Sequence, residues 1–221
     1  MTLDLLVCDI AGTTVQEHGA VYAALQDAVN AAGGDVDRPA VARWMGADKQ
    51  EAVRALLGSL ATDELVEQAH ADFSSRLADA YEQRSPEPFA GVAELIGELR
   101  ADGVRVALTT GFDRAIAEPL LASIGWDRDT VDALVCADEV AAGRPAPYMV
   151  FRAMERCGVH RVDRIAVVGD TVLDLRAGTS AGAAAVIGVL TGGVDVAVLG
   201  AERHTHLLPG LADLPGVLEQ L

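Results

Sequence analysis

The sequence predicts an α/β fold, in which a helical cap domain is inserted into a doubly wound parallel sheet. Short apolar runs that end in polar, glycine-containing loops alternate with helical stretches over much of the 221-residue chain. Residues 21–85 differ, because helical spacing continues through the whole segment. Half of the residues are hydrophobic (51%) but few are aromatic (4%), which favours an α/β protein over a disulfide scaffold or a disordered chain.

The strands are indicated by five apolar runs. The first, Leu3 to Cys8, is too short for a helix and leads into DIAGTT, so it predicts a buried parallel strand that ends in a loop. Four later runs have the same pattern: 104–108, 131–136, 165–168 and 184–189. Helices are expected between and around them at 91–101, 115–124, 147–156 and 173–181. This alternation is typical of a parallel sheet with helices on both faces.

The predicted division places the catalytic core in residues 1–18 and 86–221 and the helical cap in residues 19–85. Within the cap, the stretch DELVEQAHADFSSRLADAYEQ has the 3.6-residue spacing of a long amphipathic helix. Gly19 lies near the first crossing between the two parts, and Pro86, Pro88 and Gly91 lie near the second, so we expect hinges there.

The chain is strongly acidic, with 33 Asp and Glu against 17 Lys and Arg. A net charge of −16 argues against nucleic acid or an anionic membrane surface as a partner, since both bind basic surfaces. Cys8, Cys136 and Cys157 are an odd number without C-x-x-C spacing, which favours reduced thiols. The N-terminal residues show no basic, apolar leader pattern, so we expect a cytoplasmic location.

Polar side chains of the kind used in phosphoryl transfer follow four of the predicted strands. They are Asp9, Thr110, Arg144 and the pair Asp170 and Asp174. One strand-end aspartate is more often a helix cap than a catalytic group, but the set in this order is a stronger signal. Carboxylates at Asp9 and Asp170 suit Mg²⁺, while Arg144 and Thr110 can bind phosphoryl oxygens. Asp9 could then attack phosphorus as a nucleophile.

These motifs resemble the haloacid dehalogenase superfamily of phosphotransferases over nearly the whole chain. The resemblance implies a Rossmann-like core, an inserted cap and Mg²⁺ as cofactor. Most phosphatases of the superfamily have D-x-D at the first loop, with a second Asp that protonates the leaving oxygen. This chain has Asp9-Ile10-Ala11, and it has Arg144 where a lysine is usual.

Both departures match the phosphonatase-like branch, which resembles this chain in DIAGTT, TTG, AGRPAPYM, GDTVLD and MGADK. The resemblance implies that a lysine in the cap, here Lys49, forms a Schiff base with an aldehyde substrate. It further implies the metal ligands and the substrate contacts. The metal set is Asp9, Ala11 through its carbonyl, and Asp170, with Asp174 in support; the substrate contacts are Thr13, Met45, Gly46 and Gly111.

Lys49 is the only lysine in the chain, beside sixteen arginines. Cleavage of a carbon–phosphorus bond leaves electrons on carbon, and a protonated imine at Lys49 would accept them. No acid is then needed to protonate a leaving oxygen, so Ala11 can stand in place of the second Asp. Arginine cannot form an imine, because its guanidinium stays protonated. Asp48 and Glu51 predict a capped helix that begins at Lys49, and the positive end of a helix lowers the pKa of a cation there. An incidental surface lysine is the competing interpretation.

One position departs from phosphonatase, in which a histidine three residues after the lysine assists proton transfer. Here that position is Ala52, and His18, near the first hinge, is a weak substitute. His204 and His206 form an H-x-H pair without an evident third ligand, and we interpret them as part of an edge strand. Residues 191–193 lack the spaced glycines of a nucleotide-binding loop.

The sequence therefore predicts a Mg²⁺-dependent hydrolase that cleaves phosphonoacetaldehyde or a related 2-oxoalkyl phosphonate. Two alternatives stay open. One is a phosphomonoesterase, which would keep activity without Lys49, and the other is a catalytically silent relative that binds a metabolite or a partner protein. The exact substrate is open, and a homodimer formed through the cap is conceivable.

Overall fold

A six-stranded parallel sheet forms the centre of the protein in the computed structural model, which describes residues 3–218. The strand order is β5-β4-β1-β6-β7-β8, and every neighbouring pair is parallel. The strands are β1 Leu5–Asp9, β4 Arg105–Thr110, β5 Ala133–Cys136, β6 Ile165–Gly169, β7 Ala185–Val189 and β8 His206–Leu208. The predicted α/β fold with a parallel sheet is confirmed.

Helices cover both faces of this sheet. Successive side chains of β1 point to opposite faces of the sheet, and all of them are buried. Leu5 and Val7 belong to the core cluster that contains Met149 of α7 (Tyr148–Cys157), whereas Leu6 and Cys8 belong to the cluster that contains Ile96 of α5 (Val92–Ala101). The other helices around the sheet are α6 Arg114–Ser123, α8 Val172–Ala181, α9 Val196–Gly200 and α10 Pro215–Leu218. Short 3₁₀ turns lie at 137–139, 162–164 and 211–213.

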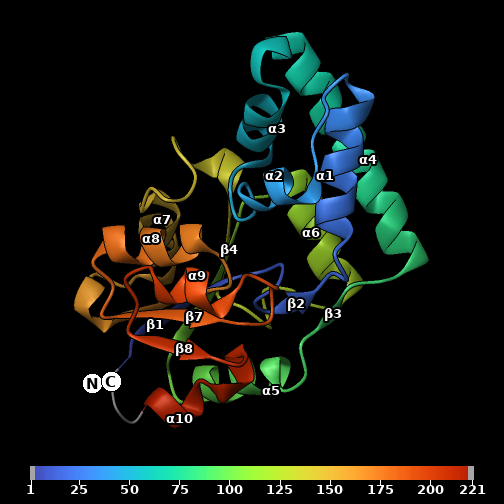
Figure 1. Cartoon of the computed structure of the whole chain (residues 1–221). Coiled ribbons are helices and arrows are strands. Elements are labelled where there is room, and N and C mark those ends of the chain that lie inside the picture. The colour runs from blue at the N-terminus through green and yellow to red at the C-terminus, as the bar shows by residue number, and fades with distance from the viewer. Residues whose placement is uncertain (1–2, 219–221) are drawn as a thin grey trace.

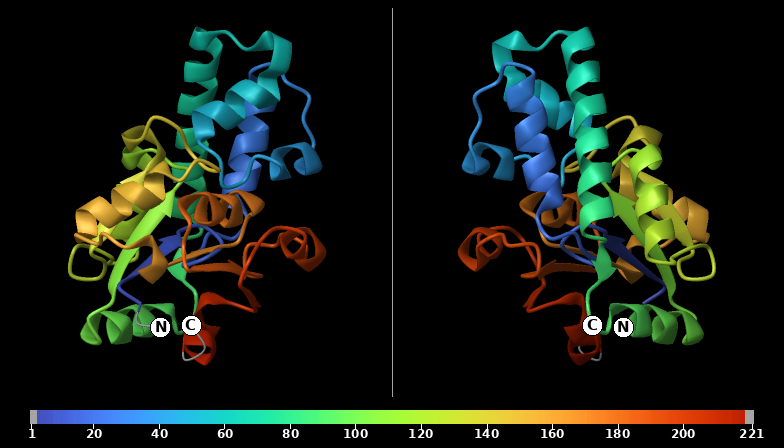
Figure 2. Two further views of the ribbon diagram at one scale, coloured as in Figure 1. Left: turned by 90° about the vertical axis from the view of Figure 1, so that its left-hand side faces the viewer. Right: turned by 90° about the vertical axis from the view of Figure 1, so that its right-hand side faces the viewer.

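A separate helical layer lies at one end of the molecule (Figures 1 and 2). It contains α1 Ala20–Ala31, α2 Arg38–Ala42, α3 Lys49–Leu57 and α4 Asp63–Gln83, with a 3₁₀ turn at 58–60. Its apolar faces pack inward through buried residues such as Leu25, Val53 and Phe73. The long helix predicted over DELVEQAHADFSSRLADAYEQ is observed with those bounds, since Thr62 caps its first turn by accepting a hydrogen bond from the Leu65 N–H at 3.1 Å.

The two connections between this layer and the sheet run side by side. The strand β2 (Val15–Gln16) pairs antiparallel with β3 (Glu87–Pro88), in the register Val15 to Pro88 and Gln16 to Glu87. Gly19 and Gly91 have positive φ angles (81° and 79°) at these crossings, a conformation that glycine adopts without strain. The segments predicted as hinges thus form a paired ribbon.

All three cysteines are free; Cys8 and Cys136 are buried and Cys157 is half-buried. Over residues 3–218, no helix combines the length and the apolar character needed to cross a bilayer.

Candidate active site

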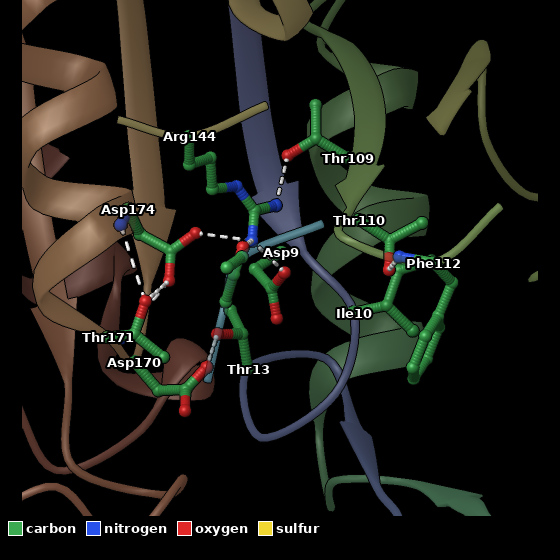
Figure 3. Close-up of polar contacts among 12 residues, drawn as sticks. Asp9, Ile10, Thr13, Thr109, Thr110, Phe112, Arg144, Asp170, Thr171 and Asp174 are labelled. Atoms are coloured by element: carbon green, nitrogen blue, oxygen red, sulfur yellow. Dashed lines mark hydrogen bonds and ion pairs between the residues drawn. The ribbon is translucent and has the colours of Figure 1, made fainter. Parts of the chain in front are cut away.

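Four strand ends bring polar side chains together at one edge of the sheet. Asp9 is the last residue of β1 and lies in register with Thr109 of β4, while Asp170 follows β6 directly. Arg144 comes from the loop after β5 and reaches back between them (Figure 3). Because parallel strands all end at the same edge, topology alone places these groups near one another.

Arg144 is buried and contacts polar side chains from three other parts of this arrangement. Its Nη1 lies 2.6 Å from Asp9 Oδ1 and 2.8 Å from Asp174 Oδ1, and its Nη2 donates to Thr109 Oγ1 at 2.8 Å. Burial lowers the pKa of the guanidinium, but the carboxylates of Asp174 and Asp9 outweigh burial and raise it. A fixed cation therefore lies against Oδ1 of Asp9, and no hydrogen bond from Arg144 engages Oδ2.

The two other aspartates have different surroundings. Asp174 uses both oxygens within the protein, since Oδ1 pairs with Arg144 and Oδ2 accepts from the Thr171 N–H (3.1 Å) and hydroxyl (2.5 Å). Asp170 accepts a hydrogen bond from Thr13 Oγ1 at 2.8 Å. Burial, and then repulsion from Asp9 and Asp174, raises the pKa of Asp170 well above its ordinary value. Burial also raises the pKa of Asp9 to about 6, although Arg144 opposes the rise.

The surroundings of Asp9 and Asp170 fit a divalent cation. Two buried carboxylates repel each other until a positive charge lies between them. Gly12 and Gly192 flank Asp170 so closely that a β-carbon on either would overlap its carboxylate, which keeps this oxygen ligand accessible. Within residues 3–218 no three Asp, Glu, His or Cys side chains form a metal-binding group. The side-chain ligands would therefore be this pair, which suits Mg²⁺ because it binds few carboxylates and keeps waters.

Lys49 approaches from the helical layer. It is the first residue of α3, and Asp48 caps this helix by accepting a hydrogen bond from the Glu51 N–H at 2.8 Å, as the sequence predicted. The lysine is only 4% exposed; its Nζ donates to the Ala47 carbonyl at 2.8 Å and lies 5.4 Å from the centre of the Phe112 ring. Burial lowers the pKa of Lys49 to about 8, against the opposing charge of Asp9. At pH 7 a pKa of about 8 leaves about one amine in ten neutral, against about one in 10³ for an ordinary lysine.

The segment that carries Lys49 lies in contact with loops of the sheet. The Gly46 carbonyl accepts a hydrogen bond from Arg144 Nη1 at 3.4 Å. Gly46 lies so close to Thr171 that a β-carbon on Gly46 would overlap the threonine side chain. Gly111 lies equally close to the carbonyl group of Ala47. These contacts bring Lys49 and Asp9 to one cavity.

That cavity has a volume of about 310 Å³. Most of the predicted site residues line it: Asp9, Ala11, Met45, Gly46, Lys49, Thr110, Gly111 and Asp170. Thr13, Arg144 and Asp174 are buried and contact lining residues instead. The Thr110 hydroxyl accepts from the Phe112 N–H at 3.1 Å, so its own hydrogen remains available to a ligand.

Several lining residues were not anticipated from the sequence. Phe112 flanks Lys49, while Tyr22 and Arg38 come from the helical layer. Thr109, which contacts Arg144 and does not line the cavity, was also missed, although it precedes Thr110 at the end of a predicted strand. His18, which the sequence suggested as a substitute for the missing histidine, does line the cavity, and its Nε2 lies 3.7 Å from Glu87 Oε1.

The H-x-H pair lies elsewhere in the fold. His206 is in β8 at the edge of the sheet, as expected, and His204 Nδ1 contacts the Glu202 carbonyl at 2.7 Å. Neither histidine lines the cavity. Ala52 is fully buried, so the position of the expected histidine holds only a methyl group.

Comparison with known proteins places this site in a family. Residues 3–182 match the model of the haloacid dehalogenase-like hydrolases. The chain is 30% identical over 223 residues to the phosphonoacetaldehyde hydrolase of Bacteroides fragilis, covering 94% of this chain and 82% of the relative. It is 29% identical over 211 residues to that of Bacillus cereus, covering 89% and 79%.

A solved structure from Oleispira antarctica, described as a phosphonoacetaldehyde hydrolase-like protein, has the same fold. Its TM-score is 0.85 at 22% sequence identity, and the match covers 100% of this chain and 92% of the other. The expectation drawn from the motifs is confirmed at the level of family and fold. This protein is a hydrolase of the haloacid dehalogenase superfamily and belongs to its phosphonatase-like branch.

Proposed function

We propose that this enzyme cleaves the C–P bond of phosphonoacetaldehyde or of a related 2-oxoalkyl phosphonate, with Mg²⁺ as cofactor. The observation that carries the proposal is the position of Lys49. It is the chain's one lysine, it is buried with a lowered pKa, and it lines the same cavity as Asp9. Cleavage of a C–P bond beside a carbonyl needs an electron sink, which an imine at Lys49 can supply, whereas cleavage of a P–O bond needs none.

Each residue has a chemical role in this proposal. The neutral amine of Lys49 condenses with the substrate carbonyl and releases water, and the resulting imine takes up a proton. Asp9 attacks phosphorus through the oxygen that Arg144 does not hold. The C–P electron pair then moves into the protonated imine and gives an enamine. Water hydrolyses the aspartyl-phosphate, and the enamine is protonated and hydrolysed to the carbonyl product.

Thr110 and the metal site bind the phosphoryl group. The hydroxyl hydrogen of Thr110 offers a donor to its oxygens, while Arg144, which does not line the cavity, holds Asp9 in position for attack. Bound at Asp9 and Asp170, Mg²⁺ would offset the repulsion between the Asp9 carboxylate and the phosphonate. Ala11 fits the proposal, since a carbon leaving group needs no acid at the position where phosphate-ester hydrolases have a second Asp.

We further propose that residues 19–85 act as a mobile cap that delivers Lys49 to Asp9. The paired crossings β2 and β3 and the positive φ angles of Gly19 and Gly91 support a hinge there. Hydrogen exchange of residues 46–49 should slow when phosphate is added with Mg²⁺. Unchanged exchange in this segment, despite demonstrable phosphate binding, would rule out the movement.

The deciding experiment is phosphate release from phosphonoacetaldehyde with Mg²⁺, with and without sodium borohydride, followed by intact-mass and peptide analysis. The proposal predicts turnover that borohydride abolishes and a reduced adduct at Lys49. Lys49→Ala should lose both. If phosphate esters are hydrolysed and Lys49→Ala retains that activity, the enzyme is a phosphomonoesterase. Ligand binding without any turnover would identify a silent relative.

A further inference from the structure

The mouth of the cavity contains an arginine that no described carboxylate neutralises. Arg38 lines the cavity from the start of α2, and the centre of its guanidinium lies 5.0 Å from the centre of the Tyr22 ring. Among residues 3–218 its side chain forms neither an ion pair nor a hydrogen bond to another side chain. Other arginines of the chain, such as Arg114 and Arg156, do pair with a carboxylate.

Two carboxylates near the cavity are already engaged by other groups. Glu17 lines the same cavity, but its Oε1 accepts from the Gly19 N–H at 3.2 Å and its Oε2 from the Val21 N–H at 2.8 Å. Glu17 therefore accepts hydrogen bonds at the first turn of α1, where four backbone N–H groups otherwise lack partners. Glu87 Oε1 lies 3.7 Å from His18 Nε2. Arg38 thus lies over an aromatic ring, and its guanidinium has no side-chain partner among residues 3–218.

The position of Tyr22 links Arg38 to the reacting end of the cavity. Tyr22 lines the same cavity as Asp170, and its ring lies against Arg38. The charges of Asp170 and Arg38 act in opposite directions on the pKa of Tyr22, which burial raises. Arg38 therefore adds a positive charge to the cavity beyond the groups that bind the phosphonate, so the cavity suits a ligand with a second anionic group.

We propose that the substrate carries a second anionic group, a carboxylate beyond its carbonyl, and that Arg38 binds this group. The inference rests on the proposed function and narrows its substrate class to carboxylated 2-oxoalkyl phosphonates, of which 3-phosphonopyruvate is the simplest probe. The chemistry is otherwise unchanged. The C–P bond breaks, the Asp9 O–P bond forms, and the electron pair enters the protonated imine. Overall, one water is consumed and pyruvate and phosphate are released.

Binding of two unreactive ligands tests the inference without turnover. 3-Phosphonopropanoate has both anionic groups, and propylphosphonate has the same chain without the carboxylate. Calorimetry with Mg²⁺ should show that the wild type binds the first at least about tenfold more tightly, the size expected for one charge-assisted contact. Arg38→Gln should abolish this preference. Arg43→Gln is the matched control, since Arg43 is another exposed arginine at the same helix and does not line the cavity.

Turnover separates the two proposals. If the inference holds, kcat/KM is higher for 3-phosphonopyruvate than for phosphonoacetaldehyde, and Arg38→Gln lowers only the former. Equal binding of the two unreactive ligands, or a preference that survives Arg38→Gln, would show that Arg38 is a solvated cation and would overturn the inference. Hydrolysis of phosphonoacetaldehyde in that case would leave the proposed function intact. Failure to cleave either compound would reject the proposed function.

Discussion

Gly111 lies directly against the carbonyl group of Ala47, so that a β-carbon on Gly111 would overlap the carbonyl oxygen. The same oxygen accepts the hydrogen bond from Lys49 Nζ. The absence of a side chain at Gly111 thus sets how closely the segment carrying Lys49 approaches the loop after β4. Since Gly111 does not have a positive φ angle, the requirement for glycine here is steric.

Gly111→Ala should therefore displace Lys49 from the cavity. We expect kcat/KM for the phosphonate substrate to fall roughly 100-fold, the usual effect of misplacing a reacting group by about 1 Å. Phosphate release and borohydride trapping at Lys49 measure the loss. Gly143→Ala is the matched control, because its β-carbon would lie 3.5 Å from the Asp48 β-carbon, an ordinary contact. Equal activity of the two variants would show that this contact does not position Lys49.

Lys49→Met should stabilise the protein at neutral pH. Burial disfavours the charged amine, and the fall of its pKa from 10.5 to about 8 corresponds to roughly 3 kcal/mol at 1.36 kcal/mol per pH unit. Between pH 8 and 10.5 the unfolded chain binds the proton and the folded chain does not, so wild-type stability rises with pH there. Urea unfolding should show the advantage of Lys49→Met at pH 7 and its decline toward pH 10. A pH-independent difference would contradict the lowered pKa.

Arg144→Lys should inactivate the enzyme although it keeps the charge. A single ammonium group cannot present planar donors to Asp9, Asp174 and Thr109 together. We expect kcat/KM to fall about 10²- to 10³-fold, as when one fixed donor is lost from a preorganised site. Arg152→Lys, at an exposed pair with Glu155, controls for the substitution itself. Activity of Arg144→Lys within a few-fold of the wild type would show that the simultaneous contacts of the guanidinium are not required.

Mg²⁺ should stabilise the wild type and not Asp170→Asn. Binding at 100 times the dissociation constant adds about 2.7 kcal/mol to the free energy of unfolding. A thermal melt with Mg²⁺ or with EDTA measures this difference. Asp35→Asn, at an exposed position away from the cavity, should respond as the wild type does. A Mg²⁺-dependent rise in the Tm of Asp170→Asn equal to that of the wild type would place the metal elsewhere.

Much of the site could be predicted because topology and local chemistry determine it. Asp9 and Asp170 meet because parallel strands end at one edge, and Lys49 begins a helix because Asp48 caps it. Contacts between distant segments could not be predicted in this way. The bond from Arg144 to Thr109 depends on strand register and on the return of a loop, and Arg38 reaches the cavity through the packing of α2 beside α1. The two-residue strands β2 and β3 are too short to show any periodicity.

The ribbon formed by β2 and β3 has a further consequence. Because Gln16 lies opposite Glu87, the chain leaves the sheet domain and returns to it at adjacent points. Residues 17–86 could therefore be replaced as one segment by a short reverse turn, or by a different insert, without altering the order of the six parallel strands. A different insert could thus replace this helical layer while Asp9, Arg144 and Asp170 stay in place at the ends of the strands.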